Sequence, residues 1–111
     1  MGKRETLGDF EELVLLAVMR LGGRSYGVTI REVIEERTGR EISLGAIYPT
    51  LDRLEEKGYV ESWTGEPREE RGGRARRHFR LQPAGLEALR RSREEIVAMW
   101  EGFGAEGEAH P

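Results

Sequence analysis

Three short segments with helical periodicity, each followed by glycine, constrain the fold of this chain more than any other feature. Apolar residues recur at helical spacing over residues 9–21, 25–38 and 43–57. Glycine stands directly after each segment, and it is the residue that most often ends a helix. The pattern predicts three short helices joined by tight turns.

The first residues of these segments are typical helix caps. Asp9 and Glu12 have the spacing of a capping box, in which each side chain accepts a hydrogen bond from the other residue's backbone. Ser25 and Ser43 offer hydroxyl groups that can accept from early helical amides. We therefore expect Asp9, Ser25 and Ser43 to be the N-caps of the three helices.

The third segment has one apolar face and one face of small or polar residues. The spacing of Ile47, Leu51 and Leu54 predicts a buried stripe. On the opposite side the helical period places Ala46, Pro49, Thr50, Arg53 and Lys57, and we expect these residues to be exposed. Pro49 lacks a backbone donor, which predicts a kink or a tight first turn.

An arginine-rich hairpin is predicted after the third helix. Residues 59–64 and 76–81 alternate in polarity as strands do, with Val60 on one face and Tyr59, Glu61 and Trp63 on the other. Six arginines stand between Arg68 and Arg80 against two glutamates. Gly72-Gly73 lies between the strands, where the hairpin is expected to turn.

The last helix is predicted to begin at Pro83 and to run to about Trp100. Proline suits the first helical position, because the amide it lacks would have no partner there. A seam of apolar residues, interrupted by Arg93, follows the heptad spacing of a helix that pairs with another. Its members are Leu86, Leu89, Ile96, Trp100 and Phe103. Because segment 9–21 is apolar nearly all round, we expect a second copy of the chain to cover it.

Length and composition limit the function of the chain. Its 111 residues suit one domain, which we divide into an arm at 1–8, a core unit at 9–82, a dimerisation helix at 83–101 and a disordered acidic tail at 102–111. There is no Cys and there are only two His residues, so we expect no metal, no cofactor and no catalytic residues. The longest apolar run has seven residues, so no membrane partner is expected and the chain is predicted to be cytoplasmic.

The order of these elements predicts a mostly α-helical fold with a two-stranded β wing: a winged helix-turn-helix followed by a C-terminal dimerisation helix. Such a fold places its third helix in the major groove of double-stranded DNA. The residues expected to contact base edges are Ser43, Gly45, Ala46, Thr50 and Arg53. The residues expected to hold phosphates are Lys57, Arg74, Arg76 and Arg77. For Tyr48, a DNA contact and a core position with a hydrogen-bonded hydroxyl both remain open.

Four sequence motifs resemble those of PadR-type transcriptional regulators. They are Tyr26–Ile30 (YGVTI), Ser43–Leu51 (SLGAIYPTL), Arg53–Gly58 (RLEEKG) and Arg74–Leu81 (RARRHFRL). The resemblance covers roughly residues 7 to 100 and implies a bacterial homodimeric repressor that pairs through its first and last helices. A single helix after the wing is similar to the small subfamily. Dimer symmetry then implies a pseudo-palindromic operator.

Two questions stay open on the sequence alone. Some small regulators that resemble this chain hold a flat aromatic ligand between paired Trp residues, so Trp100 is either a site for a small aromatic or hydrophobic effector or plain dimer packing. Plain packing is favoured, because Trp is common at interfaces. The alternative function is a winged-helix module that binds a protein, without sequence-specific DNA binding.

Overall fold

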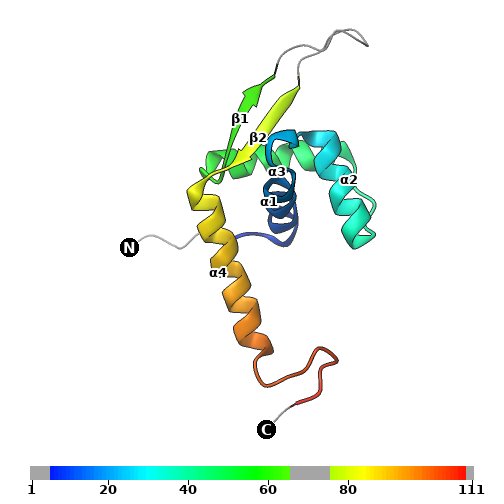
Figure 1. Cartoon of the computed structure of the whole chain (residues 1–111), viewed down its shortest axis with the longest axis vertical. Coiled ribbons are helices and arrows are strands. Elements are labelled where there is room, and N and C mark those ends of the chain that lie inside the picture. The colour runs from blue at the N-terminus through cyan, green and yellow to red at the C-terminus, as the bar shows by residue number, and fades with distance from the viewer. Residues whose placement is uncertain (1–5, 66–75, 110–111) are drawn as a thin grey trace.

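Four α-helices and one antiparallel pair of strands make up the part of the chain that the computed structural model describes, residues 6–65 and 76–109. Figure 1 shows their arrangement. In chain order the elements are α1 (Asp9–Leu21), α2 (Gly27–Thr38), α3 (Leu44–Glu56), β1 (Val60–Thr64), β2 (Arg77–Leu81) and α4 (Pro83–Trp100). A short 3₁₀ turn, Gly22–Arg24, follows α1. The predicted mostly α-helical fold with a two-stranded wing is confirmed.

The wing is an antiparallel pair in which Val60 lies opposite Leu81 and Thr64 lies opposite Arg77. Its root is fixed to the helices by the backbone, because the Phe79 amide donates to the carbonyl of Ser25 at 2.9 Å, just before α2. The expected turn at Gly72-Gly73 lies outside the described residues.

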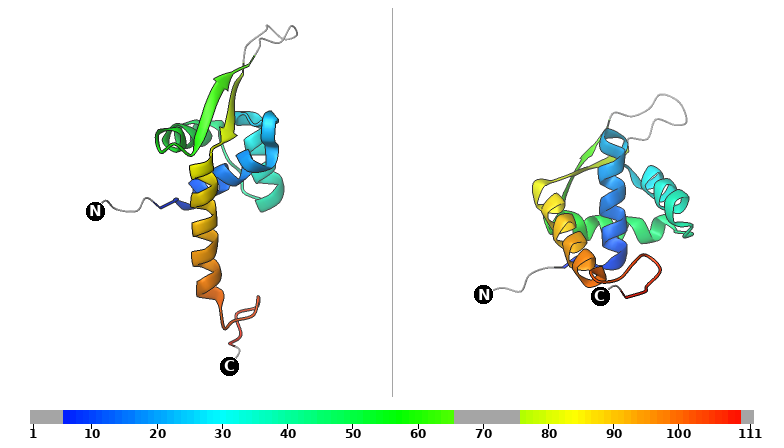
Figure 2. Two further views of the ribbon diagram at one scale, coloured as in Figure 1. Left: turned by 60° about the vertical axis from the view of Figure 1, so that its left-hand side comes forward. Right: turned by 60° about the horizontal axis from the view of Figure 1, so that its bottom comes forward.

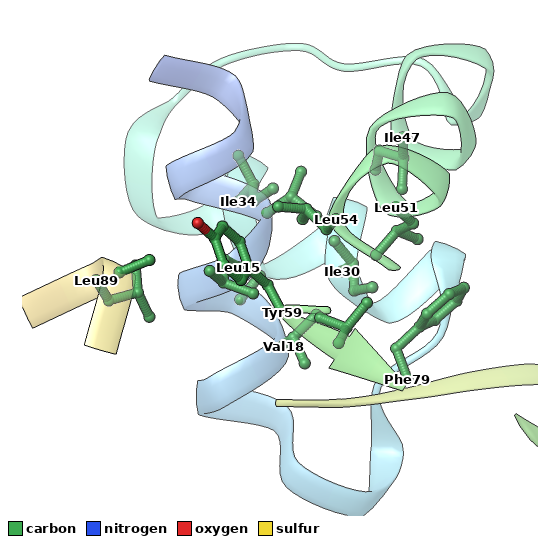
Figure 3. Close-up of a cluster of buried hydrophobic side chains, with 14 residues drawn as sticks. Leu15, Val18, Ile30, Ile34, Ile47, Leu51, Leu54, Tyr59, Phe79 and Leu89 are labelled. Carbon is green, nitrogen blue, oxygen red and sulfur yellow. The ribbon is translucent and has the colours of Figure 1, made fainter. Parts of the chain in front are cut away.

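The core forms around α1, which the other helices and the wing root surround (Figure 2, right). Figure 3 shows Leu15 and Val18 of α1 packed toward Ile30 of α2, Leu51 of α3 and Phe79 of β2. All five side chains are almost completely buried. Leu7, which was expected to belong to a flexible arm, also packs against this core.

Two of the three predicted N-caps are wrong. Gly8, one residue before Asp9, is the N-cap of α1, and its amide donates to the carboxylate of Glu11 at 2.7 Å. Tyr26 is the N-cap of α2, and its amide donates to the Thr29 hydroxyl at 3.1 Å. In both cases the side chain three positions after the N-cap accepts the hydrogen bond from the N-cap amide. Helix periodicity does not detect this contact, and the predicted N-cap was therefore one residue away.

Ser25 is the C-cap of the 3₁₀ turn rather than the N-cap of α2, and it is fully buried. Its hydroxyl has no hydrogen-bond partner within the described residues, and its carbonyl receives the Phe79 amide. Tyr59 was predicted to share a strand face with Glu61 and Trp63, but it precedes β1 and is buried. Its carbonyl accepts from the Gln82 amide at 2.9 Å, which joins the two ends of the hairpin.

Helix α4 begins with Pro83 at its first position, as predicted, and then leaves the body of the domain (Figures 1 and 2). Ala88 and Leu89 are buried in its first half, whereas the apolar side chains of its second half are exposed. The helix ends at Trp100, so Phe103 does not continue the heptad seam as predicted. Phe103 instead pairs with Ala109 in an isolated β-bridge, within the stretch that was expected to be a disordered tail.

Candidate nucleic-acid interface

The start of α3 presents small, exposed residues on a capped helix end. Ser43 is the N-cap as predicted, since its hydroxyl accepts from the Ala46 amide at 3.2 Å. Gly45, Ala46 and Pro49 are exposed, while the predicted stripe of Ile47, Leu51 and Leu54 is fully buried. The helix continues through Pro49. This end of α3 therefore offers a close approach to base edges without large side chains in the way.

Thr50 does not belong to this exposed face, which corrects the prediction. Only 2% of the residue is exposed. Its hydroxyl donates to the carbonyl of Ala46 at 3.0 Å and accepts from Nη2 of Arg53 at 3.1 Å. The hydroxyl is therefore occupied inside the protein, and Thr50 is not available to contact a base.

Tyr48 lies across the beginning of α2. A Cβ atom added to Gly27 would stand 2.2 Å from the Tyr48 hydroxyl oxygen, so this packing requires glycine at position 27. The residue is nevertheless 39% exposed. Tyr48 thus joins α3 to α2 and still presents part of its ring to solvent, which is compatible with a DNA contact and excludes a fully buried core position.

A buried carboxylate ties the end of α3 to the start of α1. Glu11 is 8% exposed, and its two carboxylate oxygens accept from Nζ of Lys57 at 3.1 and 3.2 Å and from Nε of Arg53 at 3.4 Å. Burial alone would raise the pKa of Glu11, but the Gly8 amide and the two cations outweigh it and lower the pKa. Lys57 is therefore a partner of Glu11 and not the exposed phosphate contact that helix periodicity predicted.

Arg77 at the root of the wing faces α3. Its guanidinium donates to Asp52 at 3.0 Å and to Glu55 at 2.5 Å, and it lies over the Phe79 ring at 4.9 Å. The pKa of Glu55 is lowered, mainly by a hydrogen bond from the Ser62 hydroxyl and then by Arg77. The Arg77 guanidinium, which was predicted to hold a phosphate, thus donates hydrogen bonds to two carboxylates of α3.

The other side of the wing carries a row of three adjacent rings with a guanidinium group at each end. His78 stacks on Trp63 at 5.3 Å and meets the Tyr26 ring edge-on at 5.4 Å. Arg76 lies over Tyr26, and Arg80 lies over Trp63. Arg76, directly before β2, therefore packs on the Tyr26 ring, which in turn contacts His78. Arg74 lies outside the described residues. Sequence reasoning missed His78 as the centre of this row, although strand alternation already placed it on the same side as Arg80.

A second surface of interest is an apolar groove between α1 and α4. Leu13, Leu16 and Met19 line it from α1, and Leu86, Leu89 and Ile96 line it from α4. Trp100 lies further along α4 and is half exposed. Of the five predicted interface residues, Leu86, Leu89 and Ile96 line the same groove, while Trp100 and Phe103 are exposed beyond it.

Within residues 6–65 and 76–109 there is no group of three or more His, Asp or Glu side chains that could hold a metal ion. No helix in the same ranges is long and apolar enough to cross a membrane. Three ion pairs of this region, Arg53–Glu11, Lys57–Glu11 and Arg77–Glu55, join α1, α3 and the wing.

Three short helices, an exposed N-terminal end on the third and a paired wing define the class of winged helix-turn-helix DNA-binding proteins. The model of the transcriptional regulator PadR-like family matches residues 15–91, which is more than half of the chain. The chain therefore belongs to the transcriptional regulator PadR-like family. The family is one of transcriptional regulators, and PadR regulators bind DNA.

The similarity extends to individual proteins. The chain is 46% identical over 66 residues to the transcriptional regulator Rv3488 of Mycobacterium tuberculosis, covering 55% of this chain and 56% of that protein. It is 35% identical over 91 residues to an uncharacterized 37.1 kDa protein in transposon TN4556 of Streptomyces fradiae, covering 82% of this chain and 24% of that protein. The chain thus spans about half of one curated relative and about a quarter of the other.

A PadR family transcription regulator from Clostridium difficile has a similar solved structure. The TM-score is 0.69 at 23% identity, and the match covers 83% of this chain and 91% of that one. At this identity the likeness concerns the fold, including the helix after the wing.

Proposed function

We propose that the chain is a sequence-specific repressor that binds a pseudo-palindromic operator as a homodimer. The observation that carries this proposal is the exposed, capped start of α3 beside the wing, in a chain of the PadR-like family. The family resemblance implies repression as the mode of action, and it implies the cytoplasm as the place where the chain meets DNA.

Base contacts are assigned to the exposed start of α3. Ser43, Gly45 and Ala46 present a hydroxyl, a bare backbone and a methyl group, which suit close contact with base edges in the major groove. Tyr48 and Arg53 flank this surface, and the Arg53 side chain is about half exposed although it contacts Glu11. Arg76 and Arg74 are assigned to DNA phosphates beside the major groove.

The homodimer is assigned to the groove between α1 and α4 and to the exposed second half of α4. Ile96, Val97, Met99 and Trp100 are each at least half exposed on the described helix. Adjacent apolar side chains of this kind mark an interaction surface, and a second copy offers the same surface in return. A two-fold axis between two α4 helices places the two α3 helices on half-sites about 34 Å apart, or at a multiple of that distance.

Plain dimer packing stays the favoured role of Trp100, and the space between it and its symmetry mate is the site proposed for a small aromatic or hydrophobic effector. The exposed indole supports this assignment, because a flat ring stacks well between two indoles. Binding there releases the operator only if the effector prefers one dimer geometry over the other.

Fluorescence anisotropy of a labelled duplex at two salt concentrations tests the proposal. The duplex is the operator selected from genomic fragments, and a scrambled duplex of equal length is the control. We expect salt-sensitive binding about 10³-fold tighter than to the scrambled duplex. Equal, weak binding to both duplexes would contradict a sequence-specific repressor and would favour the protein-binding module.

A further inference from the structure

The recognition helix α3 is acidic toward its C-terminal end, which is unusual for an element that approaches DNA. It carries three carboxylates, at Asp52, Glu55 and Glu56, against one guanidinium, at Arg53. Glu11 also draws Arg53 and Lys57 toward α1. Phosphates within about 10 Å of an unpaired carboxylate are repelled by it at ordinary salt concentrations. A protein that binds DNA through this helix needs a way to cancel these charges.

Arg77 contacts two of the three carboxylates, and its single positive charge cancels half of their combined negative charge. One guanidinium nitrogen, Nη1, donates to Oδ1 of Asp52 at 3.0 Å, and the other, Nη2, donates to Oε1 of Glu55 at 2.5 Å. The planar fork of arginine suits two acceptors at once, which a lysine ammonium does less well. Because the two acceptors lie one helical turn apart on α3 and Arg77 begins β2, the pair of contacts also fixes the wing against the recognition helix.

The immediate surroundings hold this arrangement in place. The second carboxylate oxygen of Glu55 accepts from the Ser62 hydroxyl of β1 at 2.7 Å, so both strands of the wing contact the same glutamate. The Arg77 guanidinium lies 4.9 Å from the centre of the Phe79 ring, which is buried. Moving the guanidinium away from α3 toward a phosphate would break two charge-assisted hydrogen bonds and leave both carboxylates without a cation beside the DNA.

We infer that Arg77 is a positioning residue for DNA binding, which reduces the negative charge that Asp52 and Glu55 of the recognition helix present to DNA, and does not itself hold a phosphate. The inference rests on the proposed function and replaces the phosphate contact that the sequence predicted for Arg77. Arg76, one residue earlier, lies on the Tyr26 ring and keeps its phosphate role.

A double-mutant cycle tests the inference, with the full chain and the selected operator duplex at one salt concentration. Arg77→Gln removes the masking charge, and we expect operator binding to weaken about tenfold or more. Asp52→Asn with Glu55→Gln removes the charges that need masking. Added to Arg77→Gln, this pair is expected to restore binding to within about threefold of the wild type. In the wild-type background the same pair is expected to change binding less than in the Arg77→Gln background.

Glu56→Gln is the matched control, because it removes one negative charge from the same exposed side of α3 without involving Arg77. Added to Arg77→Gln, it should restore little. Arg77→Lys keeps one positive charge without the fork and should give an intermediate loss. Thermal unfolding of each variant shows whether it is folded, and a merely structural loss of the wing would not be restored by removing two carboxylates.

The outcomes separate this inference from the proposed function. A wild-type chain that binds its operator, with an Arg77→Gln loss that persists in the triple variant, means that Arg77 acts through a phosphate contact or through the position of the wing, and overturns the inference alone. Additive effects, or rescue by Glu56→Gln as strong as by the pair, also overturn it. A wild-type chain that does not discriminate between operator and scrambled duplex overturns both. A loss that only the Asp52 and Glu55 variants restore supports it.

Discussion

Helix α3 and the second half of α4 are both amphipathic, but only α3 has its apolar face covered by its own chain. Ile47, Leu51 and Leu54 of α3 are completely buried against the other elements of the domain. On α4, Ile96 is 56% exposed and Met99 is 79% exposed. The helix that is proposed to read DNA has its apolar face buried by its own chain. The helix that is proposed to pair leaves its apolar face exposed, to be covered by a second copy.

The difference shows how a chain of this size divides its stabilising contacts. The side of α3 that faces away from the core is held by charges, because Glu11 contacts its C-terminal end and Arg77 contacts its exposed side. Ser92 of α4 donates to Glu12 of α1 at 2.9 Å, and beyond this contact the second half of α4 extends away from the body of the domain with its apolar side chains exposed (Figure 2). A small domain has little core to spare, so leaving this apolar surface open is consistent with stabilisation by a second copy.

The largest expected effect is that of Leu51→Ala in α3. Removing a fully buried leucine leaves a cavity in the core, and the free energy of unfolding should fall by about 2–5 kcal/mol. Urea unfolding followed by circular dichroism measures this loss. It should be the same at low and high protein concentration, because Leu51 packs within its own chain. If the loss of stability disappeared at high protein concentration, the apolar face of α3 would have to be buried by a second chain and not by its own.

Ile96→Glu in α4 is expected to act on pairing and not on the fold. A carboxylate buried between two α4 helices should raise the dimer dissociation constant about 100-fold, as measured by sedimentation equilibrium. Ala98→Glu adds the same charge about 200° around the helix and should raise it less than about threefold. If the two variants dimerise equally well, the face of α4 assigned to the dimer is wrong.

Glu11→Gln should lower the free energy of unfolding by about 1–3 kcal/mol at pH 7, because Lys57 and Arg53 lose a buried charged acceptor. The pKa of Glu11 is lowered from its ordinary value of 4.5. The contribution of the ionised group is therefore fully present above about pH 4.5 and is lost as the pH falls below that value. Urea unfolding of both proteins at about pH 7 and pH 3 should show the difference shrinking at the lower pH. A difference that grows in acid would contradict the assigned interaction.

The elements of the fold could be predicted from the sequence because each depends on local patterns. The spacing of Ile47, Leu51 and Leu54 is enough to define a buried helix face, and Pro83 is enough to begin α4. The exposed start of α3 followed in the same way from the cap at Ser43. The Gly8 and Tyr26 caps were missed by one residue, which is the usual uncertainty of a helix boundary.

The long-range partners of the site residues could not be predicted in this way. Periodicity placed Lys57 on the exposed face of α3, but its partner Glu11 is 46 residues away in the chain. Arg77 and Asp52 are 25 residues apart, and either residue alone is typical of a solvated surface. Thr50 is different, because its partner is local: it lies about 40° around the helix from Leu54, at the edge of the buried stripe, and its hydroxyl donates to the carbonyl of Ala46 one turn earlier. Pairing between distant charges depends on the assembled fold, and a single sequence carries no signal for it.

The central claim is that the apolar face of α3 is buried within one chain, whereas that of α4 is buried only between two chains. The number of chains bound per operator duplex tests this claim most directly. Sedimentation velocity of the chain with a labelled full operator is expected to show two chains per duplex. A duplex carrying a single half-site should bind at least about 100-fold more weakly, because only one of the two α3 helices then contacts DNA. One chain per duplex, with equal affinity for the half-site and the full operator, would contradict the account.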